Sequence, residues 1–192
     1  GVSWFLAKEV QASIHGGKED SNLGHESELM DRLALAALGT VADLLPLTGA
    51  NRSIVKYGLE AMKKTKRVGL VALLKESGIT QESITPYNIS HGLAPRLNAM
   101  GRLEHAIDAL RLLCTKNVEK AQMLSEKLGF TNKERQKITE DTTKHALNLI
   151  LQGVPFEKLL FVSHDSYNPG IIGLVAGKLV EEYYLPSIVL SV

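Results

Sequence analysis

A single carboxylate, Asp43, stands in a setting that indicates chemistry. It follows an apolar, helical stretch over residues 26–39 and lies in a turn that Pro46 closes. A carboxylate between apolar flanks is costly unless something compensates its charge. Coordination of Mn²⁺ or Mg²⁺ is one compensation, because these metals suit oxygen ligands. Helix capping is another, so this stretch alone leaves both a metal ligand and a structural aspartate open.

Two arginines belong to a second group of candidate residues. Arg96 and Arg102 lie on either side of Asn98. Guanidinium groups bind phosphate oxygens in a bidentate manner, so this block could form a phosphate-binding surface. The alternative interpretation is structural, with one arginine capping the preceding helix or pairing with a carboxylate such as Glu104 or Asp108.

The third group lies between a predicted strand and a predicted helix. Asn168 and Gly170 precede that helix, whose free backbone N–H groups would suit an anion. Gly170 and Gly173 would allow close approach to the backbone. A structural alternative is equally open for Gly173 and Gly177, which could serve only to pack the helix tightly against the sheet.

The order and spacing of these three blocks resemble those of the RecJ family. The blocks cover residues 39–47, 93–103 and 168–179, and the resemblance extends over nearly the whole chain. RecJ proteins are 5′-to-3′ single-stranded-DNA exonucleases of the DHH phosphoesterase superfamily. The resemblance implies a fragment of an enzyme that hydrolyses phosphodiester bonds with water activated at a two-metal site. It also implies a role in DNA repair and recombination.

The same resemblance implies roles for particular residues. Asp43 would be the catalytic residue that holds one Mn²⁺ or Mg²⁺ ion. Asn168 stands where the family more commonly has His, so it can donate a hydrogen bond but cannot transfer a proton. The implied nucleic-acid-binding residues are Arg96, Asn98, Arg102, Asn168 and Gly170.

Several motifs of the family are not found in the sequence. The other metal ligands would be an Asp-x-Asp pair, a further Asp and an Asp-His-His triplet, and a phosphate-gripping Gly-Ser-Gly-Arg-Ser motif is missing too. The sequence also begins without Met in an amphipathic pattern and ends at Val192, inside a predicted strand. We therefore expect an internal fragment of a longer protein that does not catalyse alone.

The elements that must position these residues predict an α/β protein. Residues 1–116 are expected to be the mostly helical end of a DHH-type α/β domain. Residues 117–152 are expected to form a linking helix. Residues 153–192 would then begin a second, smaller α/β domain, because a strand, a Gly-rich turn, a helix and a strand follow one another there, and the resemblance implies that this domain is DHHA1-like.

Local patterns predict the bounds of these elements. Gly39 is expected to end the helix over residues 26–39, and Pro95 is expected to keep the backbone extended before Arg96. The other predicted elements are helices over 2–15, 51–64, 68–75, 103–113 and 171–184, and strands over 158–163 and from 187.

The predicted linking helix carries possible breaks and mixed charges. Gly129, Thr131 and Asn132 could bend or break it before it ends at Gly153. Lys133, Arg135 and Lys137 alternate with polar and acidic residues, a pattern typical of a solvated face, and a DNA-facing role for them is the alternative.

Composition limits the function classes. The 192 residues are 44% hydrophobic and 22% charged, which is ordinary for a soluble globular protein. A net charge of +1 predicts that any nucleic acid is bound by a local patch, and 5% aromatic residues provide no stacking platform. The single Cys114 is expected to be buried, and it fits a reducing cytoplasm. No apolar run is long enough to span a membrane, and no signal peptide is recognised.

Three functions stay open at this point. The leading one is the single-stranded-DNA exonuclease, with a single-strand-binding protein or a helicase as partners implied by the resemblance. An oligonucleotide or cyclic-dinucleotide phosphodiesterase of the same superfamily is the nearest alternative. A non-catalytic replication scaffold is the third, and Asn168 in place of His is the feature that favours it.

Overall fold

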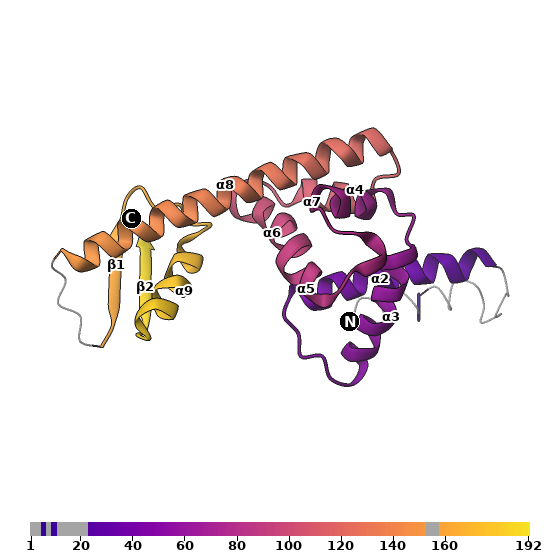
Figure 1. Ribbon diagram of the computed structural model, residues 1–192, viewed down its shortest axis with the longest axis horizontal. Helices are drawn as coiled ribbons and strands as arrows, with labels where there is room; N and C mark the ends of the chain where they lie inside the picture. The colour runs from indigo at the N-terminus through magenta and orange to yellow at the C-terminus, as the bar shows by residue number, and fades with distance from the viewer. Residues whose placement is uncertain (1–4, 7–8, 11–22, 153–157) are drawn as a thin grey trace. The chain divides into compact units, whose positions relative to one another are not determined.

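The computed structural model describes residues 5–6, 9–10, 23–152 and 158–192 (Figure 1). The chain divides into two compact units. The first comprises residues 1–95 and 109–126, and the second comprises residues 96–108 and 127–192. The predicted helix start before residue 5, the loop before residue 23 and the helix end at Gly153 lie outside the described residues.

The described part of the first unit is helical. Helix α2 packs on α3 through small side chains, with Ala34 and Ala37 fully buried. Gly58 of α3 is required at this contact, because a Cβ there would lie 2.4 Å from the Cβ of Ala37. The helical elements are α2 (Leu23–Ala42), α3 (Gly49–Lys64), α4 (Val68–Glu76), η1 (Gln81–Ser83), α5 (Pro86–Asn88), the π-helical turn η2 (Ile89–Leu93) and α7 (Ile107–Cys114).

Helices α3 and α4 confirm two of the predicted helices, whereas the predicted end of α2 is wrong. The helix continues through Gly39 to Ala42 and ends where Leu44 takes a φ of 52°. The N–H of Leu45 then donates to the carbonyl of Thr40 at 3.2 Å. The left-handed residue that closes the helix is therefore a leucine rather than the expected glycine.

The arginine block is helical rather than extended. Helix α6 (Ala94–Leu103) contains it, and Ala94, directly before Pro95, has φ −59° and ψ −42°. Proline is tolerated in the first turn of a helix because its missing N–H would have no partner in the helix. The preceding π-helical turn supports this start, since the N–H of Ala94 donates to the carbonyl of Ile89. The prediction of an extended segment before Arg96 is therefore wrong. The arginine block ends with α6 at Leu103, and α7 begins at Ile107.

Helix α8 (Val118–Leu151) is a single α-helix of 34 residues. At 1.5 Å per residue its length is about 50 Å. The predicted break does not occur, because Thr131 and Asn132 are buried and find partners. The hydroxyl of Thr131 donates to Oε1 of Glu104 at 3.2 Å, and Asn132 accepts hydrogen bonds from Arg135.

The second unit contains the strand–helix–strand motif that the sequence predicts. Strands β1 (Leu160–His164) and β2 (Ser187–Ser191) pair in parallel, with Leu160 opposite Ser187, and α9 (Ile172–Tyr183) connects them. Figure 1 shows the two strands beside α9. The core of this motif consists of Ala146, Ile150, Leu160, Val162, Tyr167, Ile171, Val175, Leu179 and Val189. The α/β fold class is confirmed.

The two compact units do not follow the predicted boundary near Gly153. Ala146 and Ile150 of α8 belong to the core of the strand–helix–strand motif, so the second unit takes up most of the long helix. Assignment of the three predicted ranges to DHH-type and DHHA1-like domains stays a prediction.

Cys114 corrects a further expectation, since its side chain is exposed rather than buried. It is the last residue of α7, where the helical pattern ends and the side chain no longer faces the core. Within the residues described here, no helix combines the length and the apolar character that crossing a bilayer requires.

Candidate functional site

Asp43 lies directly after α2, and its side chain is exposed. The expected burial cost therefore does not arise, which corrects the premise drawn from its apolar flanks. Asp43 is no N-cap either, because the next helix begins at Gly49 after Thr48. A negative charge at the C-terminal end of a helix opposes the helix dipole. The structure thus gives Asp43 no stabilising role in α2 or α3.

The described residues do not form a metal centre by themselves. Among them there is no group of three or more His, Cys, Asp or Glu side chains that could hold a metal ion. Asp43 can supply one carboxylate, and a metal bound there would need further ligands. Its role as a metal ligand stays a prediction.

Arg102 and Gly170 connect the second and third sequence blocks within the second unit. Nη1 of Arg102 donates a hydrogen bond to the carbonyl of Gly170 at 3.1 Å. A Cβ added to Gly170 would lie 1.9 Å from the carbonyl oxygen of Arg102. Position 170 therefore has to be glycine so that the end of α6 can pack against the turn. The sequence predicted a different reason, namely that glycine would let an anion approach the backbone.

Asn168 forms the turn that presents Gly170. Its side-chain Oδ1 accepts the N–H of Gly170 at 2.8 Å, and its carbonyl accepts the N–H of Ile171 at 3.0 Å. This Asx-type turn uses the amide oxygen and leaves the NH₂ group as a donor. Gly173 and Gly177 have no atom within 4 Å of an added Cβ, so the tight-packing interpretation is wrong for both.

The helical form of the arginine block divides the surface that the sequence predicts for Arg96, Asn98 and Arg102. Residues of an α-helix are spaced by about 100°, so Asn98 and Arg102, four residues apart, lie on one face of α6. Arg96 lies on another side of the helix and is partly buried, whereas Asn98 is exposed. The helical backbone therefore separates the first arginine from the other two residues.

The acidic residues near this block pair with a lysine. Nζ of Lys127 lies 2.6 Å from Oε2 of Glu104 and 2.9 Å from Oδ2 of Asp108. The hydrogen bonds that the ammonium group of Lys127 donates to Glu104 and then to Asp108 raise its pKa. Within the described part of the chain neither carboxylate is paired with Arg102, so this form of the structural alternative does not hold for that arginine.

Arg135 of α8 was named in the sequence only among three cations of a predicted solvated face, and its pairing with Asn132 was not foreseen. Oδ1 of Asn132, whose side chain is 4% exposed, accepts hydrogen bonds from Nε and Nη2 of Arg135 at 3.3 and 3.1 Å. Burial, and then the positive charge of Arg102, lower the pKa of the Arg135 guanidinium. The spacing of Asn132 and Arg135 by three residues was the available signal, and the exposed Lys133 and Lys137 obscured it.

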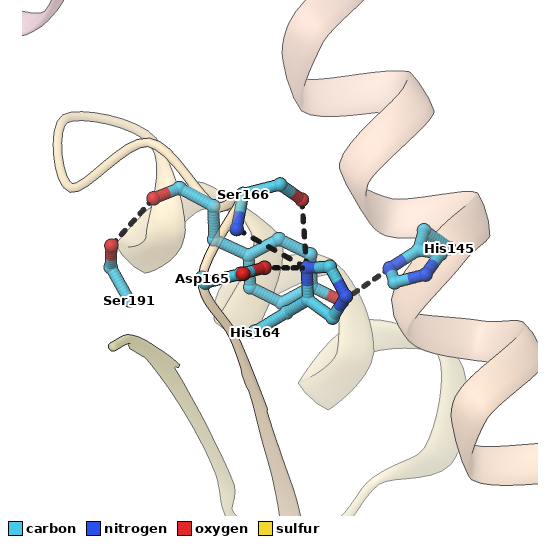
Figure 2. Close-up of polar contacts among 6 residues, drawn as sticks. His145, His164, Asp165, Ser166 and Ser191 are labelled. Atoms are coloured by element: carbon cyan, nitrogen blue, oxygen red, sulfur yellow. Dashed lines mark hydrogen bonds and ion pairs between the residues drawn. The ribbon is translucent and has the colours of Figure 1, made fainter.

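A histidine–tyrosine cluster supports the turn (Figure 2). The hydroxyl of Tyr167, a residue that is 3% exposed, lies 2.9 Å from Nδ1 of His145 on α8. The hydroxyl of Ser191 donates to the carbonyl of Tyr167 at 2.6 Å. Burial raises the pKa of the Tyr167 phenol above its ordinary value.

His164 completes this cluster from the end of β1. Its ring lies 4.7 Å from that of His145 in an edge-on arrangement, and Nδ1 accepts the N–H of Ser166 at 3.2 Å. Figure 2 shows these side chains gathered between α8 and the turn. The cluster fixes the turn that carries Asn168, and no catalytic role is needed to explain it.

Searches of curated sequences and of solved structures both find RecJ proteins. No family model matches the chain. The single-stranded-DNA-specific exonuclease RecJ of Bacillus subtilis (strain 168) is 41% identical over 166 residues, which are 86% of this chain and 21% of the relative. The protein of the same name from Escherichia coli (strain K12) is 29% identical over 98% of this chain and 34% of its own length.

Two solved structures have the same fold over most of the chain. RecJ from Thermus thermophilus in complex with Mn²⁺ superposes with a TM-score of 0.76 at 34% identity. The match covers 84% of this chain and 24% of the other chain. RecJ from the same organism in complex with Mg²⁺ gives the same TM-score and identity.

Sequence and fold together thus define a class, the single-stranded-DNA-specific exonucleases, to whose members this chain is similar over most of its length. The relatives and the solved structures that match are RecJ proteins, and the resemblance that three sequence blocks predicted is confirmed. The chain spans between 21% and 34% of the length of the curated relatives that it matches.

Proposed function

We propose that this chain is a section of a metal-dependent exonuclease that degrades single-stranded DNA from the 5′ end. The observation that carries the proposal is the agreement of fold and sequence with Mn²⁺-bound RecJ, at a TM-score of 0.76 and 34% identity. By the same resemblance, the enzyme would act in DNA repair and recombination in the cytoplasm. Its exposed Cys114 thiol suits such a reducing compartment.

In this proposal Asp43 is one ligand of a Mn²⁺ or Mg²⁺ site. Divalent metals supply a hydroxide for phosphodiester hydrolysis by lowering the pKa of bound water. The described residues contain no group of three or more His, Cys, Asp or Glu side chains that could hold the metal, so no chemical step is assigned to them. Asp43 has an exposed carboxylate that does not cap or otherwise stabilise α2 or α3, so it is available to a metal ion.

The nucleic-acid contacts belong to the second unit. Arg102 and the Asn168 amide would donate to backbone phosphates, and Asn98 lies on the same helix face as Arg102. Arg96 would contact the strand from another side of α6. Gly170 would act indirectly, by letting the turn and α6 approach one another.

We further propose that residues 1–116 are of the DHH type and residues 153–192 of the DHHA1 type. The proposed protein partners are a single-strand-binding protein or a helicase.

The test uses the full reading frame that contains this chain. Single-stranded DNA labelled at either end is incubated with Mn²⁺ and the wild type, Asp43→Ala or Asp141→Ala. Asp141 is an exposed carboxylate of α8 and serves as the matched control. We expect mononucleotide release from the 5′ end by the wild type and the control, and none by Asp43→Ala.

Other outcomes would overturn the proposal in different directions. Release only from very short oligonucleotides would assign the protein to the small-substrate phosphodiesterases. No release by a folded, metal-supplied wild type would favour the scaffold. Full activity of Asp43→Ala would remove Asp43 from the metal site.

A further inference from the structure

We propose that Asn132 and Arg135 of α8 form a phosphate-binding site together with Arg102, in which Asn132 is the positioning residue that presents the Arg135 guanidinium. The proposal rests on the proposed function, since it takes the ligand to be a backbone phosphate of single-stranded nucleic acid. The three sequence blocks place the DNA contacts on α6 and on the turn between β1 and α9. This proposal adds Asn132 and Arg135 of α8 to them.

Asn132 is placed to hold one particular side chain. A buried amide is costly unless its polar atoms are bonded, and Oδ1 of Asn132 accepts both Nε and Nη2 of Arg135. The two residues are three positions apart and therefore lie on one face of α8. Two hydrogen bonds to one oxygen fix the plane of the guanidinium while leaving Nη1 outside this pair. A pre-oriented fork of this kind suits a phosphate oxygen.

Packing places Arg102 on the same side of α8. Glu104, two residues after Arg102, accepts a hydrogen bond from Thr131, which is one turn before Arg135. Arg102 in turn reaches the Gly170 carbonyl at 3.1 Å. The end of α6 therefore runs alongside the part of α8 that carries Asn132 and Arg135.

The charge of the two arginines is not neutralised within the described residues. Glu104 and Asp108 both pair with Lys127 there, and neither Arg102 nor Arg135 has a carboxylate partner. Burial, and then the positive charge of Arg102, lower the pKa of the Arg135 guanidinium, so the two positive charges act on one another. Partial burial strengthens the attraction of such a pair for an anion, because the local dielectric constant is lower than in water.

The first experiment measures binding of a fluorescent single-stranded oligonucleotide to this 192-residue chain by anisotropy over a range of salt concentrations. For Arg135→Ala we expect roughly tenfold weaker binding and a log–log salt slope that is smaller by about 0.7, the value for one lost phosphate contact on a single strand. Lys137→Ala is the matched control. It removes the same charge two residues away, on the other side of α8, and we expect less than about a twofold change.

The positioning role of Asn132 has its own readout in a double-mutant cycle. We expect Asn132→Ala to weaken binding nearly as much as Arg135→Ala, and to add nothing in the Arg135→Ala background. A role confined to the stability of α8 would give the same additional loss in both backgrounds. Arg135→Lys leaves the fold and charge intact but lacks the planar fork, so we expect severalfold weaker binding with an unchanged slope.

The possible outcomes separate this inference from the proposed function. If Arg102→Ala weakens binding while Arg135→Ala behaves like Lys137→Ala, the inference is wrong and the proposed function stands. If the wild type binds no single-stranded DNA, both fail. Complete displacement of the oligonucleotide by inorganic phosphate at matched ionic strength would assign the site to free phosphate and overturn the backbone assignment.

Discussion

The carbonyl oxygen of Gly170 accepts a hydrogen bond from Arg102, while the carbonyl oxygen of Arg102 occupies the space where a Gly170 side chain would begin. The contact therefore needs both residues as they are, although 68 positions separate them in the sequence. It places the turn formed by Asn168 against the end of α6, where the proposed phosphate contacts lie.

Gly170→Ala should destabilise the second unit. The added Cβ would meet the Arg102 carbonyl at 1.9 Å, and relief requires a backbone shift. Overpacking of this kind costs about 1–3 kcal/mol. Gly177→Ala is the matched control, because its Cβ meets no atom within 4 Å in the interior of α9, and it should stabilise by about 0.5–1 kcal/mol. Urea unfolding of both variants gives the comparison, and equal free energies of unfolding would contradict the contact.

Asp43→Asn should leave the fold intact while abolishing the proposed nuclease activity of the full reading frame that contains this chain. The side chain is exposed, and its charge opposes the dipole of α2, so the free energy of unfolding should change by less than about 0.5 kcal/mol. Thermal unfolding of the 192-residue chain measures this directly. A large loss of stability would show that Asp43 has a structural role instead.

Tyr167→Phe should weaken the support of the β1–α9 turn. The variant removes the hydroxyl that lies 2.9 Å from Nδ1 of His145 and leaves the imidazole without this partner, which costs about 1 kcal/mol. Tyr184→Phe removes a hydroxyl from a residue that is 90% exposed, and should have no effect. Chemical denaturation distinguishes the two, and the effect should vanish when His145 is already replaced by Ala.

Asn168→Asp should separate the structural and binding roles of this residue. The carboxylate retains an oxygen for the N–H of Gly170, so the turn and the unfolding temperature should be preserved. The variant also loses the NH₂ donor and gains a negative charge, so affinity for single-stranded DNA should fall by roughly tenfold at low salt. Unchanged affinity in the anisotropy assay would exclude the Asn168 amide from the proposed contact.

Sequence patterns predicted the elements that depend on neighbouring residues. Apolar spacing located α3 and α4, and the alternation of strand, turn, helix and strand located β1, α9 and β2, because burial of one face imposes a local period. Signals that break elements were less reliable. Gly39, Pro95 and Asn132 all lie inside helices, where the missing N–H of Pro95 is tolerated and Asn132 finds a partner in Arg135.

The candidate site was predictable in composition but only partly in arrangement. Arg102, Asn168 and Gly170 were singled out by residue type and meet in the second unit. The bond between Arg102 and Gly170 could not be predicted, because it depends on how α6 packs against a distant turn. The partial burial of Arg135 could not be predicted for the same reason, whereas its pairing with Asn132, three residues away on the same helix, could have been.

The hydrogen bond from Ser191 to the carbonyl of Tyr167 has a consequence for local unfolding. Ser191 is the last residue of β2, and Tyr167 begins the turn, so opening the turn also disturbs the strand pair. Surface loops usually exchange their amide hydrogens through small, independent fluctuations. The Gly170 and Ile171 amides, both bonded to Asn168, should instead exchange together with the amides of β1 and β2, as members of one cooperative unit.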